Sequence, residues 1–76
     1  MPRDYSKLIG RIVEKFGTRA AFAEAMGLKY EALSRRLNNK ADFKTEEYIR
    51  ACELLDIPPK EIHIYFFTPK LRKIEV

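Results

Sequence analysis

The chain has 76 residues, of which 46% are hydrophobic and 34% are charged, and its formal net charge is +4. A chain of this length holds one domain with one small core, and its hydrophobic fraction excludes a disordered protein. One cysteine and one histidine cannot form an internal disulfide or a metal site built from those residue types. There is no long apolar run for a membrane span and no apolar leader, so we expect a soluble protein of the cytoplasm.

The positive charge is concentrated in the first half of the chain. Residues 1–40 contain nine Lys or Arg and four acidic residues, a net charge of +5, whereas residues 41–76 contain six and seven, a net charge of −1. A positive field on one part of a small domain favours a nucleic-acid partner, because phosphates bind clustered basic side chains. Small soluble proteins also often carry a few extra lysines, so charge alone does not decide the function.

The first predicted helix covers residues 5–16. Its apolar residues recur at intervals of three and four, the spacing of an amphipathic helix. Asp4 is suited to be its N-cap, and Gly17 to end it. The residues expected to face the core are Leu8, Ile9, Ile12, Val13 and Phe16.

Residues 18–40 carry the pattern typical of a helix-turn-helix. Thr18 is placed to cap a second helix, and Gly27 ends that helix with a residue free to adopt positive φ. A third helix is predicted over residues 29–38. The residues expected on the inner faces of these two helices are Phe22, Ala23, Met26, Leu33 and Leu37. This is the arrangement that lays its second helix into the major groove of DNA.

Two further helices are predicted after a loop. The fourth begins with a cap at Thr45 and ends near Leu55, and a short fifth helix begins at Pro59. The inner face of the fourth helix is expected to contain Ile49, Cys52 and Leu55.

The last part of the chain combines an apolar segment with a basic arm. Residues 62–67 contain five large apolar or aromatic side chains, each costly to leave in water by roughly 1.5–3 kcal/mol. Some of them are expected to close the core and others to form a homodimer interface. Residues 68–76 are basic, and Leu71, Ile74 and Val76 fit either a short strand or an arm.

The residues around the predicted turn resemble those of the phage Cro and repressor family, over about residues 5–57. The similarity is carried by Ala23, Gly27, Leu28, Leu33, Leu37 and residues 38–40. It implies an all-α, compact five-helix lambda-repressor-like helix-turn-helix domain over residues 1–67, encoded by a phage or prophage and dimeric in its bacterial host. It also implies sequence-specific binding to a palindromic operator in double-stranded DNA, and repression of transcription without a cofactor.

The third helix is then the candidate for reading DNA bases. Its candidate base-reading residues are Lys29, Tyr30, Glu31, Ser34 and Arg35. Arg35 leads this set, since a guanidinium can donate two hydrogen bonds to guanine O6 and N7. Phosphate contacts are expected from Arg19, Arg36, Asn38, Asn39, Lys40 and Lys44.

Three positions depart from the usual pattern of that family. Arg19 replaces the Gln that usually opens the second helix, and Lys29 replaces the Ser or Thr that usually opens the third. Glu31 places a carboxylate where phosphates repel it, unless Arg35 neutralises it or a cytosine amino group donates to it. These departures support an alternative function, an antirepressor or modulator that binds a partner phage repressor through Tyr30, Glu31 and Arg35.

An enzyme is not expected from this sequence. Cys52 has the helical spacing of a core residue, and His63 lies among apolar residues. No Ser, His and Asp set, Gly-rich phosphate loop or metal-ligand spacing is present. We therefore predict a binding protein with no catalytic residue, cofactor or metal.

Overall fold

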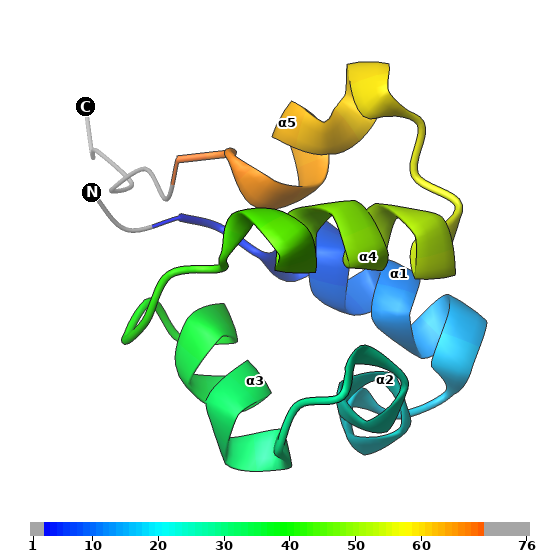
Figure 1. Ribbon diagram of the computed structural model, residues 1–76. Coiled ribbons are helices and arrows are strands. Elements are labelled where there is room, and N and C mark those ends of the chain that lie inside the picture. The colour runs from blue at the N-terminus through cyan, green and yellow to red at the C-terminus, as the bar shows by residue number, and fades with distance from the viewer. Residues whose placement is uncertain (1–2, 70–76) are drawn as a thin grey trace, which may run out of the picture.

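The computed structural model describes residues 3–69, which form five α-helices and one 3₁₀-helix around a common core (Figure 1). In chain order the elements are α1 (Ser6–Phe16), α2 (Arg19–Met26), α3 (Tyr30–Leu37), α4 (Thr45–Leu55), η1 (Pro59–Glu61) and α5 (Ile62–Phe66). Over residues 3–69 there is no strand, only an isolated antiparallel bridge between Arg3 and Pro69. The all-α class with five helices is therefore confirmed, whereas most of the predicted C-terminal strand or arm lies outside the described residues.

Helix α1 packs on the core through a narrow stripe of its apolar residues. Leu8 and Ile12 are fully buried, and Ile9 and Phe16 pack against the core less completely. Val13 was expected to face inward, but 48% of its surface is exposed. It follows Ile12 on the helix and points about 100° away from it, beyond the stripe that the neighbouring helices cover.

Side chains accept hydrogen bonds from backbone N–H groups at the start of the first two helices. The Asp4 carboxylate accepts a hydrogen bond from the Ser6 N–H at 2.9 Å, although Tyr5, not Asp4, holds the N-cap position of α1. Thr18 caps α2 as predicted, since its Oγ1 accepts from the Ala21 N–H at 3.1 Å. Both contacts satisfy N–H groups that a helix leaves without a partner in its first turn.

The turn between α2 and α3 is tight, as the helix-turn-helix pattern predicts. Gly27 adopts the left-handed conformation with a φ of 73°, which is strained for a residue with a side chain. The Leu28 N–H then donates to the Ala23 carbonyl oxygen at 2.9 Å. Figure 1 shows α2 nearly end-on while α3 lies across the view, so the two helices cross steeply.

Helix α4 presents to the core a face that is rotated from the predicted one: Leu55 is buried and Cys52 partly buried as expected, but Ile49 is not. Its buried residues are Glu47, Ala51 and Leu55, whereas Ile49, expected to face inward, is 58% exposed. Glu47 pairs with a basic side chain of α3, and the adjacent Tyr48 packs in an aromatic cluster. These two contacts fix the rotation of α4 and leave Ile49 on the outside.

An aromatic cluster holds the C-terminal helix on the core. Phe66 is fully buried, and its ring makes edge contacts with Phe43 and Tyr48 at centroid distances of 5.3 and 5.1 Å. Phe67, in contrast, is 42% exposed. The apolar segment at residues 62–67 thus closes the core in part, and its use as a homodimer interface stays a prediction.

Candidate interaction surface

The residues predicted to read DNA lie on α3 and at its N-cap. Of these, four are exposed and one, Ser34, is half-buried; the exposed ones are Lys29, Tyr30, Glu31 and Arg35. Glu31 and Arg35 face away from Leu33 and Leu37, which anchor the helix in the core. Tyr30 is the first residue of α3 and Lys29 its N-cap, so these two lie at the N-terminal end of the helix. Within residues 3–69 no ion pair joins Glu31 to Arg35. We call this surface the α3 face.

The residues predicted to contact phosphate divide into two groups. Four are exposed near the start of α2 or around and beyond the end of α3: Arg19, Asn38, Lys40 and Lys44. Asn39 instead exchanges hydrogen bonds with the Arg3 backbone at 2.8 and 2.9 Å, and Arg36 is paired with Glu47. A phosphate contact from Asn39 or Arg36 would require those bonds to open, so these two assignments fit the structure less well than the other four.

Arg36 forms a two-point ion pair that joins α3 to α4. Its Nε and Nη2 donate to the two Glu47 carboxylate oxygens at 2.7 and 3.0 Å, and its Nη1 donates to the Ala32 carbonyl oxygen at 2.9 Å. The Glu47 carboxylate also accepts from the Lys44 N–H at 2.9 Å. Lys44, not the expected Thr45, holds the N-cap position of α4. The side chains of Arg36 and Glu47 are only 12% and 10% exposed, so their ion pair is largely shielded from competing water.

This pair determines the ionisation of Glu47. Burial by itself would raise the pKa of the Glu47 carboxyl, because it penalises the charged form. Hydrogen bonds from Arg36 and the Lys44 backbone, together with the guanidinium charge, outweigh burial and lower the pKa below its ordinary value of 4.5. The carboxylate is therefore ionised at neutral pH in the folded protein.

Acid is expected to destabilise the protein through Glu47. A carboxyl whose pKa is lower in the folded chain than in the unfolded chain adds stability at pH values above its unfolded pKa, here 4.5. That contribution is lost as the pH falls through the folded pKa. Urea denaturation should show the free energy of unfolding falling below about pH 5, and Glu47→Gln should flatten part of that slope. If the free energy of unfolding depended equally on pH in the unaltered protein and in Glu47→Gln, Glu47 would not be the group responsible.

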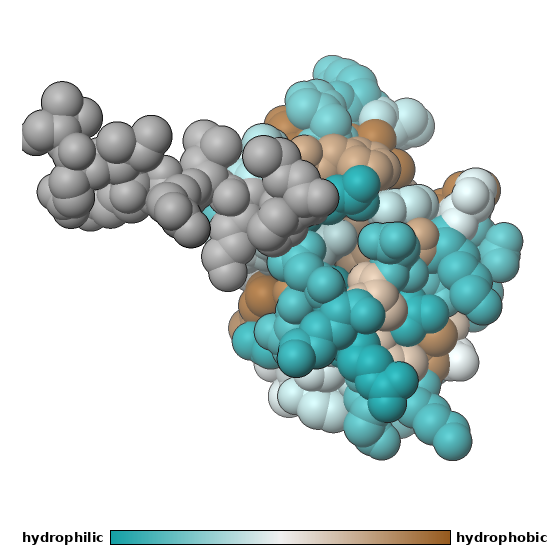
Figure 2. Space-filling model, turned by 90° about the vertical axis from the view of Figure 1, so that its left-hand side faces the viewer, coloured by the Kyte–Doolittle hydropathy of each residue, from teal (hydrophilic) through white to brown (hydrophobic). Residues whose placement is uncertain are grey.

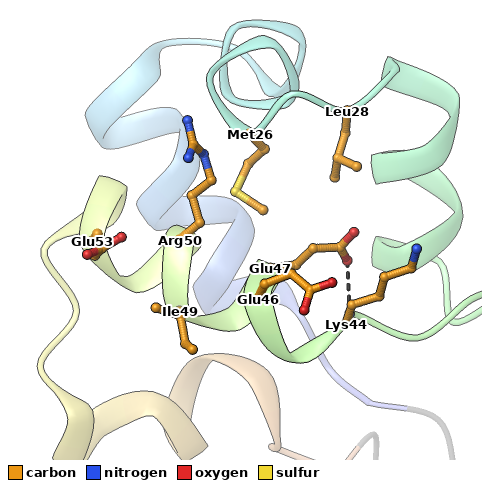
Figure 3. Close-up of a pocket in the computed structure, with 8 residues that line it drawn as sticks. All are labelled: Met26, Leu28, Lys44, Glu46, Glu47, Ile49, Arg50 and Glu53. Atoms are coloured by element: carbon orange, nitrogen blue, oxygen red, sulfur yellow. Dashed lines mark hydrogen bonds between the residues drawn. The ribbon is translucent and has the colours of Figure 1, made fainter.

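A groove of about 430 Å³ lies between the α2–α3 turn and the outer side of α4 (Figure 3). Met26 and Leu28 line it from the turn, and Ile49 lines it from α4. Its charged lining residues are Lys44, Glu46, Glu47, Arg50 and Glu53. The Arg50 Nε donates to the Ala25 carbonyl oxygen at 3.3 Å, so this side chain connects α4 to α2 across one end of the groove.

A second hollow of about 320 Å³ adjoins the first and has an almost entirely apolar lining. Ile49 and Glu53 line both hollows, and we call the two together the α4 groove. The other residues that line the second hollow are Cys52, Ile57, Pro59 and Ile62.

Burial raises the pKa of the Cys52 thiol, so Cys52 is a lining group and not an activated nucleophile. Sequence reasoning missed this groove because it assigned Ile49 to the core.

Figure 2 shows the side of the molecule that lies on the left in Figure 1, where α3 is found. This face is mostly hydrophilic, with hydrophobic side chains in small patches. His63 is exposed on α5. In the part of the chain that the structure describes, no three His, Cys, Asp or Glu side chains are grouped to hold a metal ion, and no helix is long and apolar enough to cross a membrane. The α3 face and the α4 groove are therefore the candidate functional surfaces.

Comparison with known proteins places the chain among phage regulators. The family model described as protein of unknown function (DUF739) matches residues 1–69, so the chain belongs to this family. No curated protein gives a significant match. Among solved structures, the chain is similar to the modulator of repression (MOR) of the temperate bacteriophage TP901-1 from Lactococcus lactis, with 43% identity, a TM-score of 0.78 and coverage of 95% of this chain and 97% of that chain. The expected relation to phage regulatory proteins is confirmed, whereas the narrower relation to Cro stays a prediction.

Proposed function

We propose that this member of the DUF739 family is a phage modulator of repression, which acts by binding a partner repressor protein. The observation that carries the proposal is the similarity to the TP901-1 modulator, at 43% identity over nearly the full length of both chains. A shared fold alone does not establish a shared function, because function resides in the site. The exposed surfaces of this chain must therefore also suit a protein partner.

Two exposed hydrophobic side chains support such a partner. Tyr30 on the α3 face is 48% exposed, and Ile49 in the α4 groove is 58% exposed. Tyrosine is enriched among the residues that dominate protein–protein binding energy. Hydrophobic side chains that adjoin an apolar hollow commonly mark an interaction site.

Operator DNA is the second candidate partner. It is supported by the exposed basic residues on and around the α3 face, which are Arg19, Lys29, Arg35 and Lys40. It is opposed by the exposed Glu31 carboxylate, which phosphates repel. The pairing of Arg36 with Glu47 further reduces the positive charge that α3 can offer to phosphates. The balance favours a protein partner.

The proposed action consists of binding alone. It needs no catalytic residue, no cofactor and no covalent step, and it takes place where the repressor works, in the cytoplasm of the bacterial host. Modulation then depends on the affinity of this protein for the repressor, and on which repressor surface becomes covered.

The test compares the two partners directly. The protein, labelled with a fluorophore at its N-terminus, is titrated with the purified repressor of the same phage and, separately, with a pool of random DNA duplexes at two salt concentrations. We expect saturable binding to the repressor, and only weak, sequence-independent binding to DNA. The proposal is wrong if the repressor does not bind while an enriched DNA sequence does, with affinity falling about a thousandfold between 50 and 200 mM salt.

A further inference from the structure

We infer that the α4 groove, and not the α3 face, receives the repressor, and that the occupant is an amphipathic helix with aliphatic anchor residues flanked by Lys or Arg. This inference rests on the proposed function. Beyond that function, it specifies which surface of this chain binds the repressor and what kind of repressor segment is bound.

The floor of the groove suits an aliphatic anchor. Ile49 is the most exposed large hydrophobic residue within residues 3–69, at 58%. It continues into the hollow lined by Cys52, Ile57, Pro59 and Ile62, where Glu53 is the only charged lining residue. An amphipathic helix that lays its apolar face into such a groove removes both surfaces from water, with anchors spaced three or four residues apart.

The rim of the groove selects the charge of the occupant. Glu47 is paired with Arg36, so the remaining charges that line the groove are balanced: Lys44, Glu46, Arg50 and Glu53. The Arg50 side chain bonds to the Ala25 carbonyl oxygen. Glu46 lies three residues before Ile49 and Glu53 four residues after it, which places all three on one side of the helix. Neither Glu46 nor Glu53 forms an ion pair within residues 3–69. Lys or Arg residues beside the partner's anchors would meet these two carboxylates.

The charge of the repressor separates the two candidate surfaces. A protein that binds operator DNA carries basic side chains on its binding region. The α3 face is bordered by exposed Arg and Lys side chains, which repel such a partner: Arg19, Lys29, Arg35 and Lys40. Apart from the paired Glu47, the α4 groove is lined by two basic and two acidic side chains, so it does not repel such a partner. Glu46 and Glu53, which flank Ile49, offer it complementary charge. The α4 groove therefore fits a basic partner better than the α3 face does.

A matched pair of variants tests the groove. Ile49→Lys removes the aliphatic contact and introduces a charge that repels a basic partner, whereas Val13→Lys makes the same change on α1. The two positions are similarly exposed, at 58% and 48%, so both variants should fold, as circular dichroism will verify. We expect Ile49→Lys to weaken repressor binding about tenfold or more and Val13→Lys to change it less than about twofold. Glu53→Lys should slow association and reverse the dependence of its rate on salt.

A second measurement uses the only cysteine of the chain, Cys52, which lines the groove. Saturating repressor should slow its alkylation by iodoacetamide about tenfold, because the bound helix covers the thiol. The inference is overturned if Ile49→Lys binds normally and Cys52 stays reactive, or if Tyr30→Ala alone abolishes binding; in both cases the proposed function stands. If the unaltered protein does not bind the repressor at all, the proposed function fails together with the inference.

Discussion

Arg36→Met is expected to lower the free energy of unfolding by about 3–5 kcal/mol, the range measured when one partner of a buried ion pair is removed. Methionine keeps most of the aliphatic stem but leaves the Glu47 carboxylate, in a side chain that is 10% exposed, without its guanidinium partner. The contacts to Glu47 and to the Ala32 carbonyl oxygen are lost together. Because small domains are stable by only about 5–15 kcal/mol, urea denaturation at neutral pH should show a large shift of the midpoint.

The double variant Arg36→Met, Glu47→Leu serves as the control. It removes the stranded carboxylate as well, and replacing a whole buried pair by apolar residues is often neutral or stabilising. We expect it to recover most of the lost stability. A loss of less than about 1 kcal/mol in the single variant would instead mean that the pair behaves as an exposed surface ion pair.

Phe66→Ala is expected to cost about 3–5 kcal/mol, the usual range for truncating a buried Phe. Phe66 is fully buried and its ring touches those of Phe43 and Tyr48. Helix α5 has five residues, too few to be stable alone, so its position depends on this contact. Loss of the ring should therefore release α5 as well as create a cavity, and faster amide hydrogen exchange in Ile62–Phe66 would report that release.

Phe67→Ala provides a matched comparison one residue further along the chain. Phe67 is 42% exposed, so its truncation should cost about 1 kcal/mol or less. If the two variants lose equal stability, the burial that distinguishes Phe66 from Phe67 is not what holds α5 in place.

The first three helices could be predicted closely because their signals are local. Thr18 before the second helix and Gly27 after it act on the backbone within a few residues, and both perform the predicted role. Leu33 and Leu37 are buried as their spacing indicates. Such signals depend on neighbouring residues in the sequence, so they survive whatever the rest of the chain does.

Helix α4 was predicted in extent but not in rotation, because its rotation depends on tertiary contacts. Counting apolar residues favoured an inner face with Ile49, and the ion pair of Glu47 with Arg36 and the packing of Tyr48 override that pattern. The burial of Glu47 has no sequence signal apart from the arginine eleven residues earlier. The exposed Ile49, and the groove it lines, follow from that same rotation.

The rotation of α4 gives the molecule two surfaces of different character. The α3 face is basic and carries one exposed aromatic ring, Tyr30, whereas the α4 groove has balanced charges around an exposed aliphatic residue, Ile49. DNA would be drawn to the first surface, whereas a basic protein would meet no net repulsion at the second. The identity of the partner and the surface it occupies are therefore linked, and one experiment can address both.

The most direct test is an NMR titration of the ¹⁵N-labelled protein with the repressor of the same phage. We predict saturable shift changes centred on the α4 groove, at Ile49, Cys52 and Glu53, while the amides around Val13 on α1 stay unchanged. Shift changes confined to the α3 face from Tyr30 to Arg35, or produced by duplex DNA and not by the repressor, would contradict this account.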